Sequence, residues 1–238
     1  MAGKIVILTG AGLSAESGLG TFRDEGGLWA RHRIEDVATP EGFARDPALV
    51  HAFYNTRRQQ AATATPNAAH IALARLQKNW PEEVILVTQN VDGLHESAGA
   101  TAIHMHGSLA GALCASCGHR WPAPSEMFPK AACPDCHAPA ARPDIVWFGE
   151  MPYHMEEIDS HLRDCAIFAA IGTSGQVYPA AAFVVEAAQA GAETVELNLE
   201  RTEISRAFDR HHIGPATDVV PRWVDALLTG GARRLPFA

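Results

Sequence analysis

Two amides, a carboxylate and three histidines lie within one short stretch of the chain. It opens with Gln89-Asn-Val-Asp-Gly-Leu-His95 and closes with His104-Met-His106. The stretch follows a short apolar run at residues 84–88, which predicts a buried strand. Open α/β sheets bind their ligands beyond the carboxyl ends of such strands. We therefore predict a site here, whose chemistry depends on what the rest of the chain supplies.

Four of the five cysteines form two Cys-x-x-Cys pairs, Cys114 with Cys117 and Cys133 with Cys136, with fifteen residues between the pairs. Thiolates at this spacing can surround Zn²⁺ tetrahedrally, with Zn–S distances of roughly 2.3 Å. Because four thiolates leave no open position on the metal, we expect a structural zinc and not a catalytic one. Redox-active pairs are disfavoured, since neither pair follows a strand and opens a helix. Cys165 is expected to pack in a strand as a small hydrophobic residue.

Two other predicted strands run into loops of small residues. Residues 4–9 lead into Gly10-Ala-Gly12, and residues 166–171 lead into Gly172-Thr-Ser174. Glycines after a strand let the backbone approach a phosphate, and a helix that starts there aims its N–H groups at the anion. In the usual dinucleotide-binding fold, an acidic residue about 20 positions after the glycines ends the second strand and binds a ribose hydroxyl. Residues 30–34 lie at that distance here, but they show no strand pattern. The loops thus predict phosphate or ribose binding but disfavour an ordinary hydride-transfer enzyme.

Strands and helices alternate along the chain. We expect strands at 4–9, 84–88, 166–171 and 194–200, an extended run at 144–150, a short last strand at 218–220, and helices at 47–58, 67–76, 179–190 and 222–228. This alternation predicts an α/β fold in which helices cover both faces of a parallel sheet.

Bulk composition narrows the class of protein. The 238 residues are 47% hydrophobic, which suits a large α/β domain or a main domain with a small insertion. With 19 Lys and Arg against 27 Asp and Glu, the formal charge is −8, which argues against DNA, RNA or an anionic membrane as a partner. No apolar run approaches the roughly 20 residues of a membrane span, so we expect a soluble, cytoplasmic protein.

The sequence closely resembles the sirtuins, which are NAD-dependent protein-lysine deacylases, over nearly its whole length. The resemblance rests on a combination of motifs in one order: Gly10-Ala-Gly-Leu-Ser14, Thr21-Phe-Arg-Asp24, Gln89 to His95, His104-Met-His-Gly-Ser108, the cysteine pairs, Phe148-Gly-Glu150, Gly172-Thr-Ser174 and Asn198-Leu-Glu200. It implies a Rossmann-like NAD-binding domain at 1–24, 80–109 and 144–238. A smaller, discontinuous domain would combine a cofactor loop and helical insertion at 25–79 with a zinc ribbon at 110–143, and NAD and acyl-lysine would meet in the cleft between the domains.

The resemblance also implies residue roles. The dinucleotide and its mobile loop would be lined by Gly10, Ala11, Gly12, Ser14, Ala15, Glu16, Phe22 and Arg23, its phosphates or ribose by Gly172, Thr173 and Ser174, and its adenosine end by Asn198 and Glu200. Gln89 would hold the nicotinamide-side ribose, and Asn90 with Asp92 the nicotinamide pocket. A capping or turn role is the alternative for Asp92. The peptide would add as a strand beside Val146, Phe148, Gly149, Glu150 and the loop that carries Val177.

His106 would be the general base. In the sirtuin reaction the amide oxygen of the acyl-lysine attacks the ribose carbon as nicotinamide departs, and a base then activates a ribose hydroxyl against the resulting alkylimidate. An imidazole with a pKa near 6.5 suits this task at neutral pH. The nearest rivals are His95, expected to face the interior or a neighbouring loop, and His104, expected to precede the catalytic turn.

Tyr54 and Arg57 lie three residues apart, so they share a face of the predicted helix. They match the Tyr-x-x-Arg pair of sirtuins that act on acidic acyl groups, and Ala38 matches the small residue that opens the acyl pocket in that class. A guanidinium can bind the free carboxylate of a succinyl or malonyl group through two charge-assisted hydrogen bonds, and a phenol can add a third. The resemblance thus implies a desuccinylase or demalonylase that also removes acetyl groups.

Two alternatives to the deacylase stay open. One is a sirtuin-like protein ADP-ribosyltransferase, for which an acyl-carboxylate clamp has no evident use. The other is a non-enzymatic NAD-sensing module with the zinc ribbon as its interaction surface, against which His106, Asn90 and Asp92 together argue. The sequence does not fix the oligomeric state, and we take a monomer as the working expectation.

Overall fold

The main sheet is parallel throughout. A computed structural model describes residues 3–20 and 32–230 of the chain. Its six-stranded sheet has the order β3-β2-β1-β7-β8-β9. The strands are β1 (Ile5–Thr9), β2 (Val84–Thr88), β3 (Ala102–His104), β7 (Ile167–Ile171), β8 (Glu193–Asn198) and β9 (Arg210–Ile213). Because β1 pairs with β2 on one side and β7 on the other, the chain reverses its direction of winding at β1.

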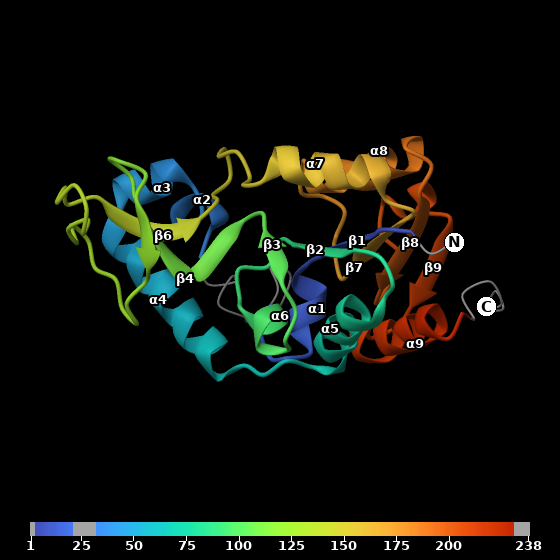
Figure 1. Ribbon diagram of the computed structural model, residues 1–238. Coiled ribbons are helices and arrows are strands. Elements are labelled where there is room, and N and C mark those ends of the chain that lie inside the picture. Colours follow the sequence, from blue (N-terminus) through green and yellow to red (C-terminus); the bar gives the residue numbers. More distant parts are fainter. Residues whose placement is uncertain (1–2, 21–31, 231–238) are drawn as a thin grey trace.

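Helices cover both faces of this sheet (Figure 1). On one face α5 (Ala68–Asn79) and α9 (Ala216–Leu228) pack against Ile5 and Ile7 of β1. On the other face α7 (Met155–Asp164) and α8 (Phe183–Gln189) pack against Val6 and Leu8. Alternate residues of β1 thus enter opposite cores, as the two-residue period of a strand requires. The expected α/β fold with helices on both faces is confirmed.

A second, three-stranded antiparallel sheet lies beside the first (Figure 1). Its strands are β4 (Gly107–Cys114), β5 (Arg120–Pro122) and β6 (Ala141–Ile145), in the order β5-β4-β6. The helices α2 (Ile34–Val37), α3 (Pro40–Arg45) and α4 (Pro47–Thr63) pack against this sheet through a core that contains Val37, Tyr54 and Trp147. The helical insertion and the cysteine-bearing segment therefore form one body, although the domain boundaries given above stay a prediction.

Shorter helices complete the chain: α1 (Ala11–Ala15), α6 (Leu94–Ser97), and the 3-10 turns η2 (Ala180–Ala182) and η3 (Ser205–Ala207). The start of the long helix α4 is fixed by its cap, because the Asp46 side chain accepts a hydrogen bond from the Leu49 amide at 2.9 Å and Pro47 occupies the first helical position.

No helix in the described ranges is long and apolar enough to cross a membrane.

Two local predictions were wrong. Residues 218–220 are not a strand but the first turns of α9, which runs through Pro221. Val220, Trp223 and Val224 of this helix are buried in the main core, and that burial offsets the hydrogen bond that the proline cannot make. Cys165 is buried as expected, but it directly follows the end of α7 instead of lying in a strand.

Candidate active site

One cleft, with a volume of about 940 Å³, opens where β1, β2 and β7 end. Parallel sheets bind ligands at such a point of reversal. The predicted site residues that line the cleft are Gly10, Ala11, Gly12, Ser14, Ala38, Tyr54, Arg57, Gln89, Asn90, Asp92, His106, Val146, Phe148, Gly149, Glu150, Gly172, Thr173, Ser174, Val177, Asn198 and Glu200. Ala15 and Glu16 are not among its lining residues, and Glu16 instead accepts hydrogen bonds from Thr217. Phe22 and Arg23 lie outside the described residues.

The two glycine loops touch each other at the floor of the cleft. A Cβ atom on Gly12 would lie 2.8 Å from the Cα atom of Gly172, and Gly172 itself has a φ of +62°. Side chains at these positions would push the loops apart, so glycine is required for both contact and conformation. Asn198, at the end of β8, donates to the Thr173 carbonyl at 2.7 Å. Three strand ends are thereby held together around the space predicted for phosphates and ribose.

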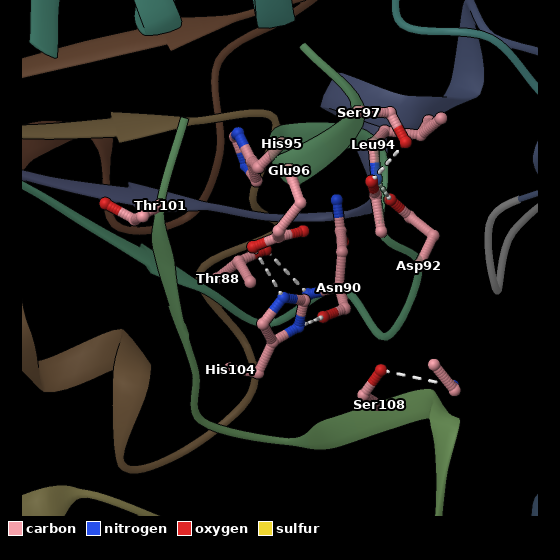
Figure 2. Close-up of polar contacts among 12 residues, drawn as sticks. Thr88, Asn90, Asp92, Leu94, His95, Glu96, Ser97, Thr101, His104 and Ser108 are labelled. Atoms are coloured by element: carbon pink, nitrogen blue, oxygen red, sulfur yellow. Dashed lines mark hydrogen bonds and ion pairs between the residues drawn. The ribbon is translucent and has the colours of Figure 1, made fainter. Parts of the chain in front are cut away.

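Asn90 is held in place by three hydrogen bonds that it donates. Its side-chain amide donates to the Gly10 carbonyl at 3.0 Å and to the Ser14 hydroxyl at 3.1 Å, and its backbone N–H donates to Thr88 at 3.0 Å. Both amide hydrogens are thus used within the protein, which leaves the amide oxygen as an acceptor. Asp92 lines the same cleft, and its carboxylate also accepts a hydrogen bond from the Leu94 amide at 3.1 Å (Figure 2). It therefore stabilises the local turn and also belongs to the cleft, so the two expectations for Asp92 are compatible.

His106 has the geometry of a base. Its Nδ1 atom lies 3.2 Å from the Gln89 carbonyl oxygen, which can only accept a hydrogen bond. Nδ1 must therefore carry the hydrogen, and Nε2 keeps its lone pair. Burial lowers the pKa of His106, although the hydrogen bond to Gln89 opposes the shift. The imidazole is consequently neutral at pH 7 and can accept a proton.

His104 has a different role from His106. Figure 2 shows it between Glu96 and Asn90: Nε2 lies 3.2 Å from the Glu96 carboxylate and Nδ1 lies 3.2 Å from the Asn90 carbonyl. Both partners are acceptors, so the doubly protonated ring satisfies both. Burial opposes the charge, but Glu96, Asn90 and Asp92 together raise the pKa of His104. The ring also lies near His95, whose own pKa is lowered to about 3, mainly by burial.

The His104–Glu96 pair should stabilise the fold in a limited pH window. The raised pKa of His104 gives stability that is present below about pH 6.5 and lost as the pH rises through the folded-state value. The lowered pKa of Glu96 gives stability that is lost at acid pH. Urea unfolding should show that Glu96→Gln costs about 1 kcal/mol or less near pH 5.5, because water screens this partly exposed pair, and less at pH 8.5. A cost that is equal at both pH values, or shared by the exposed control Glu82→Gln, would contradict this account.

His95 is a structural histidine, as predicted. It is 2% exposed, and its Nε2 atom lies 3.0 Å from the Thr9 hydroxyl. Thr9 donates its own hydrogen to Thr88 at 2.9 Å, so Nε2 of His95 is the donor in the first contact. This chain of hydrogen bonds joins the ends of β1 and β2. Of the three histidines in the opening stretch, His106 lines the cleft, whereas His95 and His104 do not.

One wall of the cleft carries the predicted acyl residues. Tyr54 and Arg57 come from α4 and Ala38 from the end of α2, and all three line the cleft. Burial lowers the pKa of Arg57, while Tyr54 and Asp92 act in the opposite direction. A half-buried guanidinium gains from an anionic ligand, since a carboxylate replaces part of the water that the cation has lost.

Trp147 is a cleft residue that sequence reasoning missed, although it stands between Val146 and Phe148 in the run assigned to the peptide. Its indole Nε1 donates to the Tyr54 hydroxyl oxygen at 3.0 Å. The run itself is not a regular strand, because β6 ends at Ile145. The amides of Val146, Trp147 and Phe148 already donate within the protein, so a peptide that adds here must find its donors elsewhere along the run.

The four paired cysteines meet at one point of the three-stranded sheet. Their sulfur atoms all lie within 4.8 Å of one another, with 3.6 Å between Cys114 and Cys136 and 3.8 Å between Cys117 and Cys133. A tetrahedron of sulfurs at ~2.3 Å from Zn²⁺ has edges of roughly 3.8 Å. The donor set and its dimensions therefore fit one structural zinc ion.

These features agree with comparisons to known proteins. A model described as Sir2 family matches residues 10–179. The chain belongs to the Sir2 family. An NAD-dependent protein deacylase from Salmonella typhimurium is 53% identical over 231 residues, which are 95% of this chain and 85% of the relative.

Solved structures support the same assignment. A Sir2 homologue in complex with NAD is 36% identical and superimposes with a TM-score of 0.89, covering 96% of this chain and 91% of that one. A Sir2 protein bound to an acetylated peptide is 25% identical, with a TM-score of 0.79 over 96% of this chain and 93% of that one. The Rossmann-like fold expected for this Sir2-family chain is thereby confirmed.

Proposed function

We propose that this protein is an NAD-dependent protein-lysine deacylase that removes succinyl, malonyl and acetyl groups and releases nicotinamide and O-acyl-ADP-ribose. The activity rests on membership of the Sir2 family and on relatives that are named as such deacylases. The acidic-acyl preference rests on one observation: Tyr54 and Arg57 line the same cleft as His106 and Asn90. We propose acylated lysine side chains of cytoplasmic proteins as the substrates, no nucleic acid or membrane as a partner, and a monomer as the acting form.

Different residues of the cleft are proposed to bind NAD, transfer the proton and bind the peptide. NAD supplies the ADP-ribose that accepts the acyl group. Gln89, Asn90 and Asp92 hold the nicotinamide half, with Asn90 oriented by Gly10 and Ser14. His106 accepts a proton from a ribose hydroxyl at Nε2, because Nδ1 is engaged by the Gln89 carbonyl. Exposed side chains that line the cleft on the two segments expected to flank the peptide, Phe148 at 45% and Tyr178 at 75% exposure, offer a surface for it.

The alternative activity is protein ADP-ribosylation, in which the ribosyl group passes to a protein side chain. An enzyme of that kind has no need for a half-buried guanidinium and a phenol in the wall of its cleft. The clamp of Tyr54 and Arg57 therefore favours the deacylase. Incubation with NAD and an acylated peptide separates the two, because the deacylase yields acyl-ADP-ribose and the transferase yields labelled protein.

Arg57→Met should shift the choice of acyl group. The variant keeps much of the side-chain volume but removes the charge-assisted hydrogen bonds to the succinyl carboxylate, which are worth about 1.5–3 kcal/mol. We expect the ratio of kcat/KM for succinyl- over acetyl-lysine peptide to fall by about 10- to 100-fold, measured by nicotinamide release.

Arg58→Met is the matched control. Arg58 is the next residue on α4, and it donates to the Leu109 carbonyl at 2.9 Å and to Asn55 at 2.8 Å instead of lining the cleft. Its replacement should leave the succinyl-to-acetyl ratio unchanged. If both variants change the ratio equally, or if neither does, the acidic-acyl assignment is wrong.

A further inference from the structure

Tyr54 does not stand alone in the wall of the cleft. Its side chain is 1% exposed, and its hydroxyl oxygen accepts a hydrogen bond from the indole Nε1 of Trp147 at 3.0 Å. The two residues are 93 positions apart, on α4 and just beyond β6, and they share one core cluster. A contact between such distant segments must be formed by the tertiary fold, since no local structure imposes it.

The hydrogen bond from Trp147 sets the direction in which the Tyr54 phenol can donate its own hydrogen. A phenol has one hydrogen to donate, and an indole N–H can only donate. Because the Tyr54 oxygen already receives the indole hydrogen, its own hydrogen must point in another direction. Burial raises the pKa of Tyr54 to about 12, so the phenol keeps that hydrogen at neutral pH. Both Tyr54 and Arg57 line the cleft, where an acyl carboxylate would lie.

Trp147 is itself held rigidly. The Arg142 guanidinium lies 3.5 Å from the centre of a Trp147 ring and donates to both Glu150 oxygens, at 2.6 and 2.8 Å. Glu150 in turn accepts the Trp147 backbone N–H at 2.9 Å. Phe43 packs on the indole with 5.1 Å between ring centroids. A cation–π contact and an aromatic contact thus hold the Trp147 indole, and the Arg142–Glu150 ion pair supports them. The indole in turn holds the Tyr54 phenol.

We propose that Trp147 is a positioning residue for acyl selection: its indole N–H orients the Tyr54 phenol so that the phenol hydrogen is presented to the carboxylate of an acidic acyl group beside Arg57. The inference rests on the proposed acidic-acyl preference. It adds that the clamp has a third component, Trp147, which acts through its hydrogen bond to Tyr54. Arg142, on β6, and Glu150 support this component through their contacts with Trp147.

Trp147→Phe tests the inference, because it keeps an aromatic ring for Arg142 and Phe43 while deleting the N–H. The readout is the ratio of succinyl to acetyl product when both peptides compete for one enzyme sample. This ratio does not depend on how much of the variant is folded. We expect it to fall about fivefold, within the range of one neutral hydrogen bond.

A double-mutant cycle separates positioning from packing. If Trp147 acts through Tyr54, then Trp147→Phe should change the ratio about fivefold in the wild type and less than twofold in the Tyr54→Phe background. Equal effects in both backgrounds, or an unchanged ratio in Trp147→Phe alone, overturn the inference.

Arg57→Met tells this failure apart from failure of the proposed function. If Arg57→Met lowers the ratio and Trp147→Phe does not, only the role of Trp147 is wrong. If Arg57→Met also leaves the ratio unchanged, the acidic-acyl preference fails, and the role of Trp147 fails with it.

Discussion

Replacement of His106 by alanine should lower kcat by about 10²- to 10⁴-fold, the usual contribution of a general base. The KM for NAD should change little, because the residues proposed to contact the dinucleotide are Gln89, Asn90 and the glycine loops, which line the cleft apart from His106. Nicotinamide departs before the base acts, so exchange of labelled nicotinamide into NAD should persist in the variant. Steady-state kinetics and the exchange assay together locate the loss at the proton-transfer step.

The pH profile of the wild type provides a second readout for His106. Since burial lowers the pKa of this imidazole, the basic form persists at neutral pH, and kcat/KM should fall only below about pH 6.5. His161→Ala is a suitable control, because His161 lies on α7, away from the cleft. Near wild-type turnover in folded His106→Ala would remove His106 from the mechanism.

Removal of the zinc should unfold the three-stranded sheet. The sheet has a small core of its own, centred on Ala112, Met127 and Ala141, which cannot replace four metal–thiolate bonds. β4 begins at Gly107, directly after His106, so activity should be lost along with the ribbon. We expect Cys136→Ala or a strong chelator to abolish hydrogen-exchange protection across residues 107–145 while β1 and β7 remain protected.

Cys165→Ala is the control for the zinc experiment. Cys165 is buried beside the main sheet and is not one of the four clustered cysteines, so its replacement should leave metal content and ribbon protection intact. If the metal assay shows that zinc is gone while residues 107–145 remain protected, the zinc is not what holds the ribbon.

Those features that depend on local sequence were predictable. A strand followed by glycines or by polar residues marks the edge of a parallel sheet, and this pattern alone indicates Gly10, Asn90 and Gly172 as site residues. The spacing of the cysteines likewise predicted four clustered sulfurs. Periodicity alone could not show that the helical insertion packs on the zinc ribbon, and the family resemblance supplied that expectation.

Features that depend on tertiary contacts were missed. In the sequence Trp147 is one more apolar residue in a run, and its bond to Tyr54 exists because α4 and β6 share a core. The same reason explains α9, in which burial of Val220 and Trp223 overrides the signal of Pro221. Polar β9 was not predicted, since Arg210 to Ile213 shows no apolar alternation and lies at the sheet edge.

The most direct test of the acyl assignment is a competition among three forms of one lysine peptide: succinyl, its neutral amide analogue succinamyl, and acetyl. With the wild-type enzyme and limiting NAD, mass spectrometry of the acyl-ADP-ribose products gives the relative kcat/KM values in one sample. Succinyl and succinamyl differ in charge and hardly in shape, so a clamp built on Arg57 and Tyr54 should favour succinyl over succinamyl by about 10-fold or more. Equal yields of the two products would contradict the account.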